Sequence, residues 1–403
     1  MHCVRKVTDD LYWVGANDHR LELFENIHPI PWGVSYNSYL LLDEQTVLFD
    51  TIDWSACRQF LENVDYLLDG RDLDVLVVNH MEPDHASSMA EVLLRFPKVK
   101  IISTPKAFML MKQFGVDVTG HDIVEVNEGD KTSFGKHEVT YLYAPMVHWP
   151  EAMVTLDLTN GVLFAADAFG SFIALDGKLF NDEVNFDRDW LDEARRYYTN
   201  IVGKYGPMVQ KLMKKAEPVL GMVKYICSLH GPVWRSDFGY ILDKYQKWST
   251  YEPEDKAVMI AYASMYGNTE SAAQALAAKL VERGVQVSVF DVSKTHVSYL
   301  ISEAFRVSHI VLASVTYNLG IYPIMHHFLY EMGALQVQNR KFAIMENGSW
   351  ARRSGDLMTE FVQNELKRCE VIGSRVSMAS QLQDAQEDEL DALADAIAKS
   401  VNE

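Results

Sequence analysis

Residues 76–89 read LVVNHMEPDHASSM, and this stretch decides how the first half of the chain folds. Apolar, mostly β-branched residues fill positions 75–78 and predict a buried strand that stops at Asn79. The loop that follows supplies four candidate metal ligands: His80, Glu82, Asp84 and His85. In an extended loop the alternate positions 80, 82 and 84 point to one side. The spacing therefore predicts that an imidazole and two carboxylates converge on a metal ion.

A solvated turn with Asp84 or Ser87 as a helix cap explains such a cluster equally well when the cluster stands alone. The rest of the chain weighs against that interpretation, because three more ligand-type residues each follow a predicted strand: His148, Asp167 and His230. A pair of transition-metal ions needs about six protein ligands. Four strand ends that present ligands in this order favour a dinuclear metal site.

The order H-x-E-x-D-H, then His, then Asp, then His-Gly-Pro resembles the metallo-β-lactamase fold, an α/β structure with an αββα sandwich. Zinc hydrolases of that fold usually carry His where this chain has Glu82, and in this respect the chain is similar to the flavodiiron proteins, or A-type flavoproteins. Replacing an imidazole by a carboxylate makes a site harder and more anionic, which suits iron better than zinc.

The resemblance implies a role for each of these residues. His80, Glu82 and His148 would hold one iron, Asp84 and His230 the other, and Asp167 would bridge the two. It also implies residues that approach the metals without binding them: His28 on the proline-rich loop 28–33, one of Tyr197 and Tyr198, and His85, which we expect to be turned away. Asp50 is a candidate hydrogen-bond acceptor behind the ligands, whereas Trp149 is expected to be core.

Length and charge limit the class of protein. At 403 residues the chain exceeds one ordinary core, and its net charge of −19 disfavours nucleic acid or an anionic membrane as a partner. No apolar run approaches the roughly 18 residues of a membrane span, and the first residues do not resemble a signal peptide, so we expect a cytoplasmic protein. The four cysteines include no CxxC pair, so we expect no rubredoxin domain and no iron–sulfur cluster. Electrons must then come from outside the chain.

Residues 251–255, YEPED, combine charge with proline and predict a linker between a metal domain, 1–250, and a second domain, 251–403. Beyond it, a strand at 257–263, a loop rich in hydroxyls and glycine, and a helix at 269–283 predict a phosphate cradle. The loop lacks the lysine of ATP-binding P-loops and closely resembles the FMN-phosphate loop of flavodoxin.

Two more loops follow strands at 309–314 and 341–345, and in an open parallel sheet such strand ends meet at the ligand. We therefore predict a flavodoxin-like, doubly wound, five-stranded parallel sheet, in which Tyr317 and Trp350 flank the isoalloxazine of FMN. The candidate FMN-binding residues are Ser264, Met265, Tyr266, Gly267, Asn268, Thr269, Ser314, Val315, Thr316, Tyr317, Asn318, Gly320, Asn347, Gly348, Ser349 and Trp350.

Together the two resemblances cover nearly the whole chain and imply an oxidoreductase with FMN and two irons that reduces O2 to water, NO to N2O, or both. A rubredoxin-like protein or a reduced deazaflavin would donate the electrons, and a head-to-tail homodimer, or a dimer of dimers, would bring FMN and iron together. Two alternatives stay open at this point. One is a metal hydrolase with an appended flavodoxin domain, and the other is an FMN electron carrier whose metal domain is inactive.

Local patterns predict the remaining elements. An antiparallel meander is expected at 11–14, 34–41 and 46–50, and helices are expected at 87–96, 190–216 and 387–400. These elements alternate as a sandwich followed by a doubly wound sheet requires.

Overall fold

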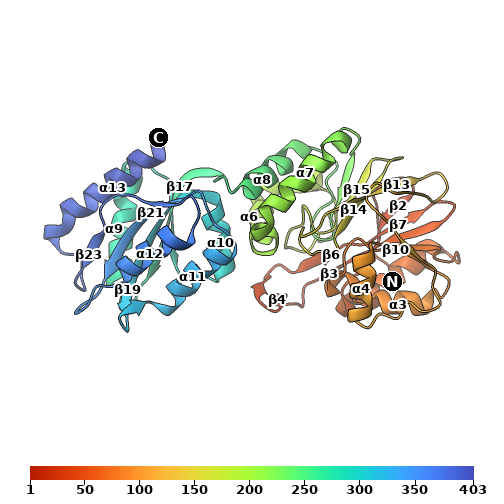
Figure 1. Cartoon of the computed structure of the whole chain (residues 1–403), viewed down its shortest axis with the longest axis horizontal. Helices are drawn as coiled ribbons and strands as arrows, with labels where there is room; N and C mark the ends of the chain where they lie inside the picture. Colours follow the sequence, from red (N-terminus) through yellow and green to blue (C-terminus); the bar gives the residue numbers. More distant parts are fainter. The chain divides into compact units, whose positions relative to one another are not determined.

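A computed structural model describes residues 1–403, and its contacts divide the chain into two compact units (Figure 1). The N-terminal unit contains Met1–Tyr198 and Tyr205–Tyr245, and the C-terminal unit contains Thr199–Lys204 and Gln246–Glu403. This division falls a few residues before the linker expected at 251–255. A domain boundary at 250/251 therefore stays a prediction. No helix in the structure combines the length and the apolar character needed to span a membrane.

Two sheets form the middle of the N-terminal unit. The first is antiparallel along β1, β2, β7 and β8 and parallel from β8 to β11. In the order of the sheet, its strands are β1 (Arg5–Lys6), β2 (Leu11–Trp13), β7 (Tyr39–Leu42), β8 (Thr46–Phe49), β9 (Val75–Val77), β10 (Lys100–Ser103) and β11 (Ile123–Glu125). The second sheet consists of β12 (Lys131–Ser133), β13 (Glu138–Tyr143), β14 (Met153–Asp157), β15 (Val162–Phe164) and β16 (Tyr225–Cys227).

The two sheets face each other and share a buried core. Phe49 of the first sheet stacks on Phe164 of the second, with ring centroids 3.7 Å apart. Helices lie outside both sheets (Figure 1), which confirms the predicted αββα sandwich. These helices are α1 (Cys57–Leu68), α2 (Pro83–Ala86), α3 (Met89–Arg95), α4 (Pro105–Gln113), α5 (Phe186–Asp189), α6 (Leu191–Tyr197), α7 (Gly206–Leu220) and α8 (Phe238–Thr250), whose residues from Gln246 onward belong to the C-terminal unit.

The meander differs from the expected pattern at 34–41. That segment is not one strand, because β6 (Val34–Tyr36) pairs with β3 (Ala16–Asp18) while β7 belongs to the first sheet. Asn37 lies at the break: its amide donates to the carbonyls of Ser228 and Gly231, and its carbonyl oxygen accepts from the Trp13 indole. Nearby, β4 (Leu23–Phe24) pairs with β5 (His28–Pro29) in a short hairpin.

Two predicted helices are interrupted. The helix expected at 87–96 starts as α2 at Pro83 and restarts as α3 at Met89. The helix expected at 190–216 passes from α6 through a π-helical turn, Tyr198–Val202, and a 3-10 turn, Gly203–Tyr205, before α7 begins. Pro207 favours this restart, because proline lacks the N–H that an uninterrupted helix would use and fits the first turn of a new one.

The C-terminal unit is the predicted doubly wound sheet. Its parallel strands lie in the order β18 (Val287–Asp291), β17 (Asp255–Ala263), β19 (Val307–Tyr317), β21 (Lys341–Asn347) and β22 (Glu370–Val371). A second segment, β23 (Val376–Met378), also pairs with β21, so the expected fifth strand is split in two. The short β20 (Gly320–Ile321) folds back on β19.

Helices cover both faces of this sheet (Figure 1). One face packs against α9 (Asn268–Glu282) and α13 (Glu387–Asn402). The other packs against α10 (Val297–Arg306), α11 (Pro323–Ala334) and α12 (Ser354–Glu365). Both faces are buried, as the continuous apolar strands predict. The three candidate FMN loops follow the carboxyl ends of β17, β19 and β21.

Candidate metal centre and flavin loops

Four buried side chains form a first cluster in the N-terminal unit. They are His80, Glu82, His148 and Asp167, and one ligand atom from each lies within 4.8 Å of the others. His80 follows β9 and Asp167 follows β15, while His148 lies on the turn between β13 and β14. His148 Nε2 is 2.9 Å from Glu82 Oε2 and 3.0 Å from Asp167 Oδ2. Glu82 Oε2 is also 3.2 Å from His80 Nε2.

A second cluster contains Asp84, His85 and His230. Asp84 Oδ2 is 3.2 Å from His85 Nε2 and 3.1 Å from His230 Nε2. Asp167 of the first cluster also reaches the second, because its Oδ2 faces His148 while its Oδ1 lies 3.3 Å from His85 Nε2. One carboxylate therefore stands between the two groups, and the arrangement can hold two cations.

This geometry differs from the expectation for the loop 80–84 in two respects. The chain is extended only as far as Glu82, because Pro83 starts the helical turn α2. That turn carries Asp84 away from His80 and into the second cluster. It also turns His85, which we expected beside the site, so that the imidazole points into the second cluster 3.0 Å from His230.

Buried hydrogen bonds fix the orientation of the loop and of two imidazoles. Asp50 accepts from the backbone N–H groups of Asn79 and His80, at 2.7 and 3.2 Å, as expected of a residue behind the ligands. His230 Nδ1 donates to the Ser35 carbonyl at 2.7 Å. His80 Nδ1 lies 2.9 Å from Glu151 Oε1. Sequence reasoning missed Glu151, for which the only signal is a carboxylate three residues after His148.

Without metal, the carboxylates attract protons to the imidazoles. Burial alone would lower the pKa of His148, but hydrogen bonds to Asp167 and Glu82 raise that pKa to about 9. The pKa of His85 is raised to about 10 in the same way, against burial, by Asp84 and Asp167. Burial opposes ionisation of Asp167, yet its pKa is held well below the usual range by His80 and His148. The site thus prefers ionised carboxylates and bound positive charge.

The donor set fits a pair of hard, redox-active metal ions. Imidazole nitrogens and carboxylate oxygens are ligands that suit iron, and no cysteine takes part. Asp84 Oδ1 is buried without a hydrogen-bond partner, which is costly for a carboxylate unless a cation lies nearby. The residues present therefore fit a dinuclear iron site.

Aromatic and loop residues surround the clusters. Tyr197 is fully buried, its ring lies 5.5 Å from that of His230, and its hydroxyl has no hydrogen-bond partner. Burial, followed by the charges of Asp167, Glu82 and Asp84, raises the pKa of Tyr197 well above its ordinary value. Tyr198 instead packs on Tyr245 at 5.0 Å. Of the two tyrosines expected near the metals, the structure brings Tyr197 to the clusters.

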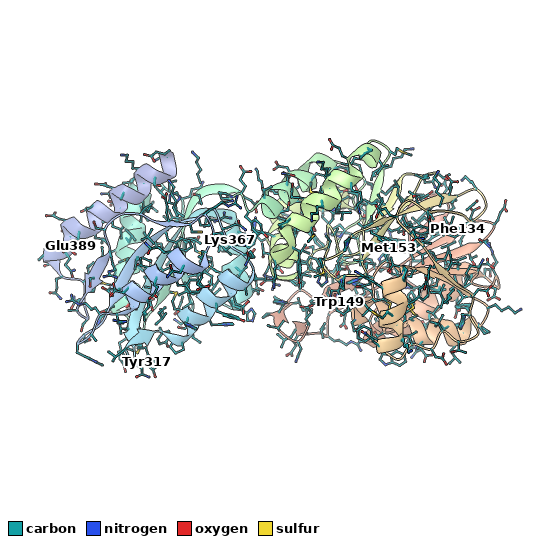
Figure 2. The ribbon with its side chains drawn as sticks, in the orientation of Figure 1. Phe134, Trp149, Met153, Tyr317, Lys367 and Glu389 are labelled. Atoms are coloured by element: carbon teal, nitrogen blue, oxygen red, sulfur yellow. The ribbon has the colours of Figure 1, made fainter.

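The hairpin β4–β5 and Trp149 flank the first cluster. Glu25, on the turn of the hairpin, has its pKa raised to about 8 by burial and by the nearby Glu82. His28 Nε2 lies 3.7 Å from Glu25 Oε2. Trp149, labelled in Figure 2, sits edge-on to His80 at 5.5 Å and stacks on Phe114. It is half-buried beside the site, not in the core as expected.

The first flavin loop has the geometry of an anion cradle. Gly267 adopts φ +92°, a conformation that favours glycine, and its N–H donates to Ser264 Oγ at 3.0 Å. The loop leads into α9, whose N-terminal N–H groups and positive dipole end attract phosphate. Thr269 is buried in the first turn, where its hydroxyl accepts from Asn347 Nδ2 at 3.2 Å.

All three loops present exposed aromatic rings. Tyr266 and Trp350 are 91% and 92% exposed, and Tyr317, labelled in Figure 2, is 41% exposed at the end of β19. Exposed aromatic rings at these strand ends are available to stack on a planar ligand. Gly348 is required by the third loop, because a Cβ there would lie 1.8 Å from the Ala351 carbonyl.

Some predicted FMN residues are less accessible. Ser314, Val315 and Asn347 are buried at the strand ends. Thr316 Oγ1 accepts from the N–H groups of Arg353 and Ser354, so this hydroxyl supports the start of α12. The more accessible loop residues form an anion cradle, which fits the phosphate of FMN, and present aromatic rings, which fit its isoalloxazine.

Comparisons with known proteins match a different family model to each half of the chain. A family model described as ODP family beta lactamase matches residues 34–231, and a flavodoxin model matches residues 260–397. The chain is 32% identical to the nitric oxide reductase of Moorella thermoacetica, over 83% of each chain. It is also 32% identical to the anaerobic nitric oxide reductase flavorubredoxin of Aeromonas salmonicida, over 85% of this chain, and spans 66% of that protein's length. The structure of rubredoxin oxygen:oxidoreductase from Desulfovibrio gigas superposes with a TM-score of 0.91 at 27% identity, covering 99% of both chains.

Proposed function

This chain belongs to the flavodiiron proteins, and from that premise we propose that it is an oxidoreductase that reduces nitric oxide to nitrous oxide, dioxygen to water, or both. Electrons enter at FMN in the C-terminal unit and are used at a non-haem di-iron site in the N-terminal unit. The names of the Moorella and Aeromonas proteins support the nitric oxide reaction. The name of the Desulfovibrio protein supports the oxygen reaction.

The observation that carries the proposal is the position of Asp167 between two ligand clusters. In this proposal His80, Glu82 and His148 hold one iron, Asp84 and His230 hold the other, and Asp167 bridges them. We add His85 as a further ligand of the second iron, because its Nε2 faces Asp84 and His230. When bound, the two irons and FMN supply the electron transfer that the reduction requires.

The chain itself supplies charge, hydrogen bonds and exclusion of water. Glu82, Asp84 and Asp167 place three carboxylates among the imidazoles, which favours iron over softer metals. Reduction of two NO to N2O consumes two electrons and two protons, and reduction of O2 to two waters consumes four of each. We assign a hydrogen-bonding role toward the substrate to Tyr197, because its buried hydroxyl has no other partner. We assign His28 to the edge of the metal site, beside Glu25.

For FMN, we propose that the loop 264–269 binds the phosphate and that Tyr317 and Trp350 flank the ring system. Gly267 and the start of α9 direct N–H groups at the anion. Within the second and third loops, Tyr317, Asn318, Gly320, Gly348, Ser349 and Trp350 form the ligand surface. Ser314, Val315, Thr316 and Asn347 hold that surface in place.

We propose a rubredoxin-like protein or a reduced deazaflavin as the electron donor, and the cytoplasm as the location. The Desulfovibrio relative is named for rubredoxin, which supports the first donor. We also propose a head-to-tail homodimer or a dimer of dimers, with the domain boundary at 250/251. Analytical ultracentrifugation of the loaded protein tests the assembly, and a fully active monomer would contradict it.

The proposed reaction is tested by an anaerobic assay of the protein loaded with ferrous iron and FMN. With NO or O2 and a reduced donor, gas consumption is expected, together with N2O when NO is supplied. Glu82→Ala and His148→Ala should abolish it. Unchanged consumption in both variants would instead favour an FMN electron carrier. A purified protein that holds two zinc ions and consumes neither gas would favour a metal hydrolase.

A further inference from the structure

Glu151 is the buried carboxylate that contacts a proposed iron ligand from behind. It lies on the turn that leads into β14, and its side chain is 0% exposed. Its Oε1 atom accepts the backbone N–H of Met81 at 2.9 Å and lies 2.9 Å from His80 Nδ1. The Glu151 backbone carbonyl accepts from the Thr104 hydroxyl, which fixes the turn itself.

These contacts determine which ring nitrogen of His80 carries a proton and which is free to bind a metal ion. An ionised carboxylate only accepts hydrogen bonds, so His80 Nδ1 is the donor in the second contact. His80 Nε2 is then the nitrogen left to bind a metal ion, and it points at Glu82 and Asp167. An imidazole backed by a carboxylate is a stronger electron donor to a metal than one backed by a neutral group.

In the second cluster, no such carboxylate accepts from the outer nitrogen of His230. The ring of His230 donates from Nδ1 to a neutral carbonyl, that of Ser35. Negative charge behind an imidazole is therefore placed on one side of the dinuclear site. Glu151 Oε2 is buried without a hydrogen-bond partner, so no further donor offsets the negative charge that Glu151 places behind His80.

From this asymmetry we propose that Glu151 is a positioning residue that makes the two irons unequal: the iron held by His80 is bound more tightly and is oxidised more readily than it would be without Glu151. This inference rests on the proposed di-iron function. It assigns Glu151 a role through His80, with no contact to substrate.

Glu151→Gln is the informative variant, since the amide oxygen accepts the same two N–H groups while the negative charge is lost. Asp157→Asn is the matched control. Asp157 Oδ2 also lies 2.9 Å from a buried imidazole, that of His137, in the same unit, but outside both clusters. If losing a buried carboxylate charge beside a histidine only destabilises the protein, both variants should be destabilised to a similar extent.

Two readouts besides activity are measured on the protein loaded with ferrous iron and FMN. The first is retention of iron against a ferrous chelator, repeated with Zn2+ as a redox-inactive probe. In Glu151→Gln, one of the two metal ions should be lost about 10- to 100-fold more readily, and the other should be unaffected. The second is an anaerobic redox titration of the two iron steps followed by EPR. In Glu151→Gln, the reduction potential of one iron step should become more positive, and that of the other should not change.

Retention and both potentials equal to wild type in Glu151→Gln would overturn the inference, as would equal shifts in Asp157→Asn. A wild-type protein that binds two irons while the variant behaves identically refutes only the role of Glu151. A wild-type protein that binds no iron pair refutes the proposed function, and the inference falls with it.

Discussion

The Nε2 atoms of His85 and His230 lie 3.0 Å apart, and both face Asp84 Oδ2. His230 donates from Nδ1 to the Ser35 carbonyl, so its Nε2 carries a lone pair toward His85. Two imidazole lone pairs repel at this distance unless a proton or a metal ion lies between the rings. The pair is therefore best understood as half of a chelate that Asp84 and Asp167 complete.

Replacing His85 tests this chelate directly. His85→Asn should reduce iron from two ions per chain toward one and weaken retention of the second by at least about tenfold, the loss that even an indirect supporting residue causes. Iron content after desalting, measured beside His121→Asn as a half-buried control outside the clusters, is the readout. Two tightly held irons in His85→Asn would mean that this imidazole is not a ligand.

Tyr197→Phe tests the buried hydroxyl that faces the clusters. Turnover of NO or O2 should fall about tenfold, as expected when one hydrogen bond worth about 1.4 kcal/mol is lost, with iron content unchanged. Tyr141→Phe is the control, because that hydroxyl bonds Thr132 elsewhere in the same unit. Equal turnover in wild type and Tyr197→Phe would leave the ring with a packing role only.

The exposed ring of Trp350 is expected to contribute to FMN binding. Trp350→Ala should weaken FMN binding by about 1 kcal/mol, or roughly fivefold, because one face of the isoalloxazine loses its aromatic partner. Quenching of flavin fluorescence during titration of the FMN-free protein gives the affinity. Tyr330→Ala, also an exposed ring of this unit but on α11, should have no effect. Matching losses in both variants would argue against a specific role for Trp350.

A buried triad away from the metals predicts how stability depends on pH. Burial lowers the pKa of His137, but hydrogen bonds to Asp157 and Asp10 raise it to about 9. Because this folded-state pKa exceeds the ordinary 6.5, the stabilisation is complete below about pH 6.5 and is lost as the pH rises through about 9. The shift corresponds to about 3 kcal/mol.

Thermal unfolding between pH 6 and 9.5, followed by tryptophan fluorescence, measures this dependence. The wild-type midpoint should fall over that range, whereas His137→Gln should start lower and change less. If the variant loses as much stability as the wild type between these two pH values, another group is responsible for the dependence.

Much of the fold could be predicted from local sequence patterns, because those patterns reflect interactions between residues close together in the chain. The strand at 75–78, the glycine-bearing cradle at 264–269 and the helix opened by Pro105 depend on burial, turn chemistry and capping within a few residues, and each is present. The break at Asn37 could not be read, since it depends on carbonyls near residue 230 that only the folded chain brings close.

The candidate site divides in the same way. Sequence alone determined which strand ends carry histidines and carboxylates, and hence predicted a dinuclear cluster and a phosphate loop, because ligand type and strand ends are local properties. The tertiary structure decided that Asp84 and His85 turn together into the second cluster, that Tyr197 rather than Tyr198 faces it, and that Glu151 supports His80. Those outcomes depend on the direction of side chains that lie far apart in the sequence, and direction over such distances is set by packing, not by spacing along the chain.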